Sequence, residues 1–445
     1  MSNYKYILHD YHAIKSAEIK IDGITVLSGI NGCGKSTLSR WLYYIINGNK
    51  GYDLFLTEEF KEKVSQILQR IYMACRDLDR YINRNSSSNK PLLESLSDKI
   101  RKIGTTKIHS SEQIDLIQEL FFSAYYTALA YLQESLTEDI SEVRKHRLYH
   151  ILNLNSPKNI QQALESFEKQ NDSLMHDLID KLYFNQGERP VMKFYNLINK
   201  YFEIEDETPK SIQLEEDNVN IIEEGHIAPL FGLRQAIYID TPMAIGLEDT
   251  DNPFWMTLRT LINNDKQKRD LSPNEKKLLF RIKELLGGEV ILEEKSLFEE
   301  KELYYVSQDG NVKIPLKNAA TGFKTLSYLQ RLLEEGFLNS ETLLMIDEPE
   351  AHLHPQWVVE FARLLVLMNK ELGLKIIIAS HNPDMVAAIH DIAYKEGIIN
   401  STNFYVAQPD SPQSYQYVYK DLKHEIGEIF ESFNIALENI NRYGN

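Results

Sequence analysis

The apolar and polar positions near the start of the chain follow a strand-like pattern. Residues 16–21 alternate between apolar and polar side chains, as a half-buried strand does, and the β-branched run at 24–27 is typical of a buried strand. A glycine-rich stretch follows, and then an apolar helical pattern from Ser36 to about Ile46. This part of the chain therefore predicts the order strand, strand, loop, helix.

A long helical region occupies the next part of the sequence. From about residue 55 to about residue 205, apolar positions recur with the helical period and strong helix breakers are sparse. Helices are predicted over residues 58–82, 92–103, 111–134, 160–171, 174–184 and 190–202. No heptad pattern is sustained through the region, which argues against a long two-stranded coiled coil. We interpret it as a compact helical insertion.

Strand patterns return after the helical region. Strands are predicted at 211–215, 219–223 and 235–240, then helices at 253–264 and 273–286, then a small antiparallel group at 290–293, 302–307 and 312–316. Helices at 323–335, 355–371 and 383–389 then alternate with strands at 342–346 and 375–379. This alternation predicts a mainly parallel sheet covered by helices. The last stretch predicts strands at 403–407 and 414–419 and a helix from Asp421 to about Tyr443.

The whole pattern predicts an α/β protein in four parts. Residues 1–54 and 206–390 are expected to form two halves of one head, residues 55–205 the helical insertion, and residues 391–445 a C-terminal β/α tail. No apolar run approaches the length that crosses a bilayer, and the start of the chain lacks a signal-like apolar stretch. We therefore expect a cytoplasmic protein without a membrane partner.

Composition and charge narrow the possible partners. The chain has 445 residues and a formal net charge of −16, which argues against a protein that coats nucleic acid by charge alone. A local basic patch around residues 101–107 or 144–147 stays possible, although charged faces of solvated helices explain these residues more simply. The two cysteines, Cys33 and Cys75, are too few for a disulfide framework or a cysteine zinc site.

A phosphate-binding loop lies between the predicted strand at 24–27 and the helix that follows. Residues 29–36 match the pattern G-x-x-x-x-G-K-[ST]. The glycines let backbone N–H groups turn inward around a phosphate, and the helix points its positive end at the anion. Lys35 is expected to contact the β- and γ-phosphates and Ser36 to bind Mg²⁺. The residues expected to bind ATP here are Asn31, Gly32, Gly34, Lys35, Ser36 and Thr37.

Two carboxylates follow the apolar run at 343–346. Asp347 is expected to bind Mg²⁺, directly or through water, and Glu348 to orient and deprotonate the water that attacks the γ-phosphate. His352 and His354 come next and could suggest a metal site, but they are two positions apart and no third ligand is obvious. We favour a loop that meets a partner subunit.

A histidine ends the next predicted strand. The apolar run at 376–379 is followed by Ser380, His381, Asn382 and Pro383. A lone histidine is more often structural, but its place at a strand end after the acidic pair favours a bond to the γ-phosphate. The predicted catalytic residues are therefore Glu348 and His381.

Together these elements resemble the ABC-type ATPases that are not transporters, the SMC, RecF and OLD group. Residues 347–355 and 380–383 are most similar to the OLD-type and Septu-type (PtuA) bacterial antiphage defence ATPases. The resemblance covers about residues 1–50 and 230–390, roughly half of the chain. It implies an ABC-type head in which His381 is the switch histidine and the loop around His354 crosses a dimer interface.

The resemblance also implies residues that the patterns alone do not single out. A signature loop is expected at Thr321-Gly322, where threonine replaces the usual serine and contacts the γ-phosphate held by the other subunit. A polar residue near Mg²⁺ is expected at Asp240, or at Thr241. Tyr11 and His12 are candidates to flank the nucleotide.

The function implied is an ATP hydrolase that binds ATP and Mg²⁺ and closes into a homodimer, or a higher assembly, over its ATP sites. The resemblance further implies a sensor or scaffold subunit of a bacterial antiviral complex that holds or licenses a separate nuclease of the HNH or Toprim type. No nuclease domain is expected within residues 391–445, where Glu425, Glu428 and Glu431 have helical spacing.

Other functions stay open at this point. The alternative is a DNA-repair or chromosome-maintenance clamp of the RecF or SMC kind, with DNA as its partner, and DNA-stimulated hydrolysis would favour it. A regulator that only binds nucleotide is disfavoured by Glu348. A transporter ATPase is disfavoured by the large insertion at 55–205.

Overall fold

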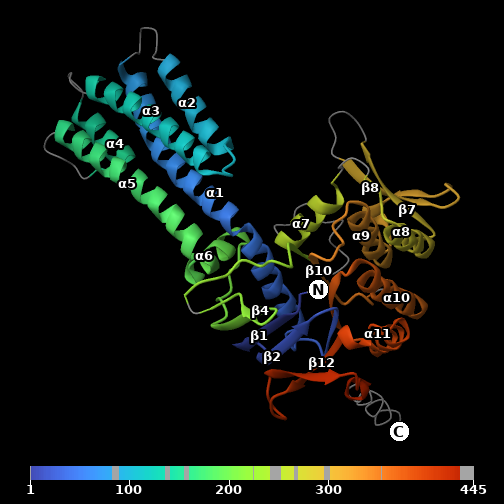
Figure 1. Cartoon of the computed structure of the whole chain (residues 1–445). Helices are drawn as coiled ribbons and strands as arrows, with labels where there is room; N and C mark the ends of the chain where they lie inside the picture. Colours follow the sequence, from blue (N-terminus) through green and yellow to red (C-terminus); the bar gives the residue numbers. More distant parts are fainter. Residues whose placement is uncertain are drawn as a thin grey trace. The chain divides into compact units, whose positions relative to one another are not determined.

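The computed structural model describes residues 2–82, 90–135, 141–154, 160–223, 225–240, 252–264, 269–294, 301–351 and 353–430. The chain forms two compact units. Met1–Lys50 and Phe194–Asn445 make up the first, which we call the head, and Gly51–Lys193 make up the second, the helical unit. Figure 1 shows the chain coloured along the sequence from the N-terminus to the C-terminus, with labels on most of the helices and several of the strands.

The head is built on one large sheet. Within the described residues this sheet has ten strands in the order β5-β4-β1-β2-β13-β12-β3-β11-β10-β6. Their bounds are β1 Tyr4–Tyr11, β2 Ile14–Ile21, β3 Ile24–Ser28, β4 Ser211–Glu216, β5 Val219–Asn220, β6 Gln235–Ile239, β10 Thr342–Asp347, β11 Lys375–Ser380, β12 Thr402–Pro409 and β13 Tyr417–Lys423. The sequence patterns predicted most of these strands, but not β1.

The part of the sheet that carries the predicted site is parallel. Strands β12, β3, β11, β10 and β6 run in one direction, whereas β5, β4, β1 and β2 pair antiparallel. Every residue of β3, β10 and β11 is buried, which explains why these strands are continuous apolar runs rather than alternating ones. The carboxyl ends of β3, β10 and β11 meet at one edge of the sheet.

A second, smaller sheet and further helices beside the first part of α1 complete the described part of the head. The small sheet is antiparallel and consists of β7 Gly288–Glu294, β8 Lys301–Ser307 and β9 Lys313–Pro315. The helices are α6 Val191–Tyr201, which begins just before the head, and α7 Pro253–Ile262, α8 Pro273–Leu286, α9 Thr321–Glu334, α10 Pro355–Leu372 and α11 Pro383–Glu396. Leucine and isoleucine side chains of α8, α9 and α10 join those of β3, β10 and β11 in one core. The predicted α/β class, with a mainly parallel sheet and a small antiparallel group, is confirmed.

The described residues of the helical unit form the rest of α1 Lys35–Ile82 and the helices α2 Lys90–Thr105, α3 Ser111–Ser135, α4 Glu142–Leu152 and α5 Ile160–Glu188. The helix α4 was not predicted, and the two helices expected at 160–171 and 174–184 are one continuous helix. None of the described helices in either unit is long and apolar enough to cross a bilayer.

The helix that starts at the phosphate loop does not end near Ile46, as the sequence suggested. It continues through Gly48 and Gly51 to Ile82. Glycine inside a helix costs about 1 kcal/mol relative to alanine, so the two glycines looked like a break. A Cβ at Gly48 would lie 2.3 Å from Cγ2 of Ile198, so the glycine is needed where α6 packs against α1.

The C-terminal stretch supplies two strands of the large sheet. Strand β12 pairs parallel with β3, and β13 pairs antiparallel with β12 and parallel with β2. The helix predicted from Asp421 is wrong at its start, because Asp421–Lys423 close β13 through ladder bonds to β12. Residues 431–445 of that predicted helix lie outside the described part of the chain.

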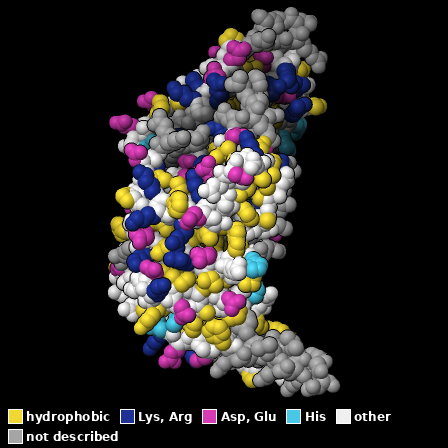
Figure 2. All heavy atoms as spheres, turned by 90° about the vertical axis from the view of Figure 1, so that its right-hand side faces the viewer, with side chains coloured by type: hydrophobic (Ala, Val, Ile, Leu, Met, Phe, Trp, Pro, Cys, Tyr) yellow, Lys and Arg dark blue, Asp and Glu magenta, His cyan; other side chains and the backbone are white. Residues whose placement is uncertain are grey.

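Charge is mixed on the face of the molecule that Figure 2 presents. Lysine and arginine side chains lie among aspartate, glutamate and hydrophobic side chains on this face, without a broad area of one sign among the described residues. Ion pairs between partly exposed side chains, such as Lys370–Glu396 at 2.7 Å, also bring the two signs together on the surface of the head. The described part of this face therefore lacks the broad positive area that would coat nucleic acid by charge.

Candidate functional site

The phosphate loop joins the buried strand β3 to α1, as the sequence pattern predicts. Gly32 and Gly34 have φ angles of +82° and +96°, in the region that glycine enters without strain. A Cβ at Gly34 would also lie 2.6 Å from Cγ1 of Ile14. Any other residue at these two positions would distort the loop that presents its N–H groups to a phosphate.

The lysine of this loop is folded back onto the loop itself. Lys35 is 6% exposed, and its Nζ donates hydrogen bonds to the carbonyl oxygens of Gly29 at 2.8 Å and Ile30 at 3.0 Å. A compact ammonium with mobile donors can exchange these carbonyl partners for phosphate oxygens. The loop therefore has the geometry expected of an anion site, with the Lys35 ammonium held beside it.

Asp347 is the last residue of β10 and is almost fully buried. Its Oδ2 accepts a 2.6 Å hydrogen bond from the hydroxyl of Tyr238, and its Oδ1 has no hydrogen-bond partner among the described residues. Burial raises the pKa of Asp347, and the nearby Asp240 adds to the rise, while contacts with Ser36 and Tyr238 oppose it. A buried carboxylate oxygen without a donor is an atom that a cation would stabilise.

These residues fit the Mg²⁺ that an ATP site implies. Mg²⁺ in nucleotide sites binds through one or two protein oxygens and completes its shell with phosphates and water. Asp347 Oδ1 and the hydroxyl of Ser36 are such oxygens, and both residues line one cavity. No group of three or more histidine, cysteine, aspartate or glutamate side chains that could hold a metal ion occurs in the described ranges, so the phosphates would have to supply further ligands.

Glu348 follows Asp347 in an unusual backbone conformation. Its φ is +47°, a left-handed value that costs a residue other than glycine on the order of 1 kcal/mol. The backbone N–H of Glu348 donates to the carbonyl of Ala379 at 2.8 Å, which ties this turn to the end of β11. The strained turn directs the chain away from β10 while the side chain of Glu348 lines the same cavity as Lys35.

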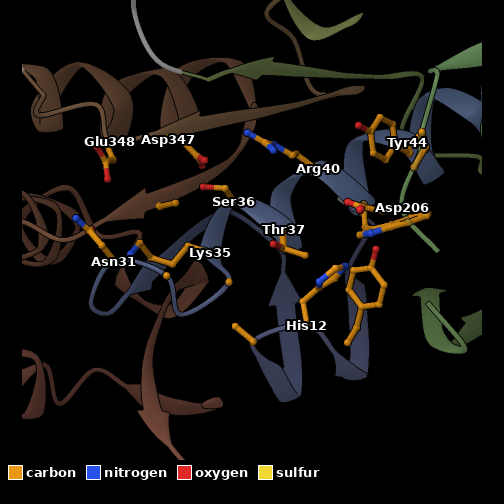
Figure 3. Close-up of a pocket in the computed structure, with 17 residues that line it drawn as sticks. His12, Asn31, Lys35, Ser36, Thr37, Arg40, Tyr44, Asp206, Asp347 and Glu348 are labelled. Atoms are coloured by element: carbon orange, nitrogen blue, oxygen red, sulfur yellow. The ribbon is translucent and has the colours of Figure 1, made fainter. Parts of the chain in front are cut away.

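One cavity of about 480 Å³ collects most of the predicted ATP-site residues. Figure 3 shows Asn31, Lys35 and Glu348 at one end and His12, Tyr44 and Asp206 at the other. Its lining consists of Tyr11, His12, Ala13, Asn31, Gly32, Gly34, Lys35, Ser36, Thr37, Arg40, Trp41, Tyr44, Ile204, Asp206, Asp347, Glu348 and Ala379. A cavity with a cationic glycine loop at one end and aromatic rings at the other suits a nucleotide.

The aromatic end contains side chains that sequence reasoning found only in part. Tyr11 and His12, the two candidates from the β1–β2 turn, do line the cavity. Trp41 packs edge-on against Tyr11 and Tyr44, with ring centroids 5.9 Å and 5.7 Å apart. Trp41 and Tyr44 lie on α1 four and seven residues after Thr37, on the same helix face, which was the signal that could have found them.

Asp240 is not free to act alone as a metal ligand. It follows β6 and pairs with Arg40, whose Nη2 lies 3.3 Å from Oδ2 of Asp240. Arg40 lines the cavity, and Asp240 does not appear in its lining. The alternative, Thr241, lies outside the described residues. The Mg²⁺ role predicted for Asp240 stays a prediction, and Arg40 is its observed partner.

His381 follows β11 at the same sheet edge. Its Nδ1 lies 3.4 Å from Oε1 of Glu348 and 3.6 Å from Oε1 of Glu350. The two predicted catalytic residues are therefore neighbours, although His381 is not part of the cavity lining. The ring is half exposed, so a phosphate or a partner could reach it from outside.

The predicted signature residues lie away from this cavity's wall. Thr321 and Gly322 begin α9, and neither belongs to the lining. His354 caps α10, with Nδ1 accepting a long 3.4 Å hydrogen bond from the N–H of Gln356. His352 lies outside the described residues. The structure therefore brings together the phosphate loop, the acidic pair and His381, and leaves Thr321-Gly322 separate.

Comparisons with known proteins agree with this geometry. A family model described as "AAA ATPase domain" matches residues 5–386. The energy-coupling factor transporter ATP-binding protein EcfA2 of Clostridium perfringens is 42% identical over 85 residues, covering 18% of this chain and 30% of that protein. The Old nuclease of Escherichia phage P2 is 28% identical over 111 residues, covering 24% of this chain and 19% of that protein. The chain thus spans less than a third of the length of these relatives.

Solved structures resemble the chain more weakly. The Smc head domain with an extended coiled coil, bound to the C-terminal domain of ScpA, from Pyrococcus furiosus, is 12% identical and has a TM-score of 0.34. The match covers 99% of this chain and 100% of that chain, but a TM-score of this size supports no argument about site or partners. The expected SMC, RecF and OLD group agrees with the likeness to the Old nuclease, while the closer likeness to Septu-type ATPases stays a prediction.

Proposed function

The chain belongs to the AAA ATPase domain family, so the chemistry of its head is ATP hydrolysis, and from this premise we propose that it is a switch operated by ATP. Two copies close over two ATP molecules, and hydrolysis lets them reopen. The observation that carries the proposal is that Lys35, Asp347 and Glu348 line one cavity. Phosphate binding, metal binding and water activation need these three side chains within reach of one γ-phosphate.

Each residue has a role that follows from its surroundings. Lys35 exchanges its loop carbonyls for the β- and γ-phosphates. Ser36 and Asp347 hold Mg²⁺, which when bound neutralises part of the phosphate charge. Glu348 accepts a proton from the attacking water, because its carboxylate is partly exposed and opens on the cavity.

A second copy completes the site in this proposal. Thr321 and Gly322 form the first turn of α9, whose free N–H groups suit an anion. They do not line the cavity of their own chain, so the phosphate they would contact is one held by another copy. His381 is half exposed beside Glu348 and would contact the γ-phosphate from the same side.

The test is nucleotide-dependent association of Glu348→Gln, which binds ATP but cannot activate water. Sedimentation velocity is measured without nucleotide, with ATP and Mg²⁺, and with ADP and Mg²⁺. We expect a dimer with ATP only, and reversion of the wild-type dimer as ATP is consumed. A species of unchanged size in all three conditions would remove dimerisation from the proposal.

We further propose that the switch controls a separate nuclease in a bacterial antiviral complex. Two points support this: the sequence likeness to the Old nuclease over 111 residues, and the similarity of residues 347–355 and 380–383 to defence ATPases. The ATP-closed dimer would hold the nuclease or license its activity. No step of DNA cleavage is assigned to this chain.

A pull-down tests this finer proposal. Tagged Glu348→Gln protein is recovered from its native cells with ATP and Mg²⁺, and Lys35→Ala protein, which should not close, serves as the control. A nuclease recovered in stoichiometric amount with Glu348→Gln alone would support the complex. DNA without a protein partner would replace it with a DNA-repair or chromosome-maintenance clamp.

A further inference from the structure

A buried glutamate links the ends of two strands at the ATP site. Glu350 lies three residues after Asp347, and its side chain is 4% exposed. Its Oε1 accepts a 2.8 Å hydrogen bond from the hydroxyl of Ser380 and a 3.1 Å hydrogen bond from the backbone N–H of His381. One carboxylate oxygen on the loop after β10 therefore holds the end of the neighbouring strand β11.

The same carboxylate lies beside the imidazole ring that follows. Nδ1 of His381 is 3.6 Å from Oε1 of Glu350 and 3.4 Å from Oε1 of Glu348. This nitrogen is buried and makes no hydrogen bond with the described residues, and the same holds for Oε2 of Glu350. A shift of roughly 0.5 Å would turn either of the two contacts into a hydrogen bond.

Burial of the Glu350 carboxylate destabilises the folded protein, which is unexpected for a residue that serves the fold alone. Burial raises the pKa of Glu350, and the hydrogen bonds from Ser380 and from the His381 backbone only partly oppose that rise. A buried carboxylate with one unpartnered oxygen costs free energy that a neutral side chain would not cost. A residue that only tied the end of β11 to the loop would need a hydrogen-bond acceptor but no charge. The orientation of an imidazole ring, in contrast, responds to a charge beside Nδ1.

We propose that Glu350 is a positioning residue for ATP hydrolysis, which fixes the end of β11 and holds the His381 ring with its Nδ1 toward the carboxylates. The two carboxylate oxygens beside Nδ1 favour the tautomer of the ring that carries its hydrogen on that nitrogen. Nε2 is then the nitrogen left to meet the nucleotide. The inference rests on the proposed function for the reaction it serves, but the ring orientation can be tested without nucleotide.

Glu350→Gln separates the two possible roles of this residue. The amide keeps an oxygen that can accept from Ser380 and His381, and it removes the charge beside Nδ1. We expect kcat for ATP to fall at least about tenfold while KM stays within about twofold, since a positioned group acts after binding. Glu396→Gln is the matched control, because Glu396 pairs with Lys370 far along α11 from the strand ends. Unchanged kcat in Glu350→Gln would overturn the proposal.

Imidazole nitrogen resonances give the second measurement. The nucleotide-free protein is labelled with ¹⁵N-histidine, and His381→Asn identifies the His381 signals by their loss. We expect Glu350→Gln to move the His381 Nδ1 resonance toward that of a free ring, and Glu396→Gln to leave it unchanged. An unmoved resonance would overturn the proposal even if kcat fell. If the wild-type protein hydrolysed no ATP, the proposed function would fail while this spectrum still decided the ring orientation.

Discussion

The hydroxyl of Tyr238 on β6 donates a 2.6 Å hydrogen bond to Oδ2 of Asp347 at the end of β10. The two strands are parallel neighbours, with Tyr238 level with Met345, so the tyrosine ring reaches two residues along the partner strand. Burial and the charge of Asp347 raise the pKa of Tyr238 well above its usual value, which keeps the hydroxyl protonated as a donor. The phenol therefore leaves Oδ1 as the carboxylate oxygen that the proposed Mg²⁺ site would use.

Tyr238→Phe should weaken Mg²⁺ use without emptying the ATP site. Loss of one hydrogen bond to a buried carboxylate costs about 1 kcal/mol or more, and Asp347 loses the contact that orients it. We expect the Mg²⁺ concentration for half-maximal hydrolysis to rise roughly fivefold. Tyr43→Phe is the control, because the Tyr43 hydroxyl bonds Thr257 at 3.1 Å and not Asp347. Equal Mg²⁺ dependence in both variants would contradict the role of Tyr238.

The parts of the site that sequence reasoning found are those encoded by consecutive residues. The phosphate loop, the Asp347-Glu348 pair and His381 each follow a buried apolar run, and a parallel sheet brings the ends of such runs to one edge. Neighbouring strand ends could therefore be expected to meet before the strand order was known. The same reasoning gave the α/β class.

The residues that sequence reasoning missed depend on pairings distant in the chain. Tyr238 meets Asp347 only because β6 lies next to β10, and Tyr419 meets the phosphate loop only because β13 enters the sheet beside β12. Gly48 looked like a helix end, although it is the point where Ile198 packs against α1. Tertiary packing decides such positions, and local propensity does not contain it.

Asp347→Asn should stabilise the nucleotide-free protein and abolish hydrolysis. Burial raises the pKa of Asp347. In the folded chain the Asp347 carboxyl therefore keeps its proton at pH values where the same carboxyl in the unfolded chain has released it. The stability of the wild-type protein therefore falls as pH rises through that window, and an amide, which does not titrate, avoids the loss. We expect the melting temperature of Asp347→Asn to exceed that of the wild type by several degrees near neutral pH and to approach it in acid.

Asp10→Asn provides a control with the opposite sign. The ion pair with Lys15 lowers the pKa of Asp10. The charged form of Asp10 therefore stabilises the folded state at pH values above the ordinary pKa of a carboxyl group. Thermal unfolding of all three proteins without nucleotide at about pH 5 and about pH 8 makes the comparison. If Asp347→Asn melted at a lower temperature than the wild type at the higher pH, the charge of Asp347 would not destabilise the folded protein.

Tyr419→Phe should loosen the phosphate loop, although Tyr419 lies 386 residues after Cys33 in the sequence. The Tyr419 hydroxyl, buried on β13, donates a 3.2 Å hydrogen bond to the carbonyl of Cys33. Its loss leaves that loop carbonyl unpaired, and we expect ATP affinity measured by calorimetry to fall about threefold to tenfold. Tyr405→Phe removes a buried hydroxyl that accepts from the Lys20 N–H, and it should leave ATP affinity unchanged. Equal affinities in the two variants would show that the loop does not depend on β13.

Mixing two inactive variants should restore hydrolysis if each ATP site is shared between two chains. Lys35→Ala disables the phosphate loop, and Thr321→Asp places a negative charge in the first turn of α9, where a helix tolerates it but a γ-phosphate does not. A mixed dimer has one site with an intact loop facing an intact signature, so an equal mixture should recover about a quarter of wild-type activity. Lys35→Ala mixed with Glu348→Gln should recover none, since every site then contains a lesion. If the first mixture also stays inactive while both variants are folded, Thr321 does not complete the ATP site of another copy.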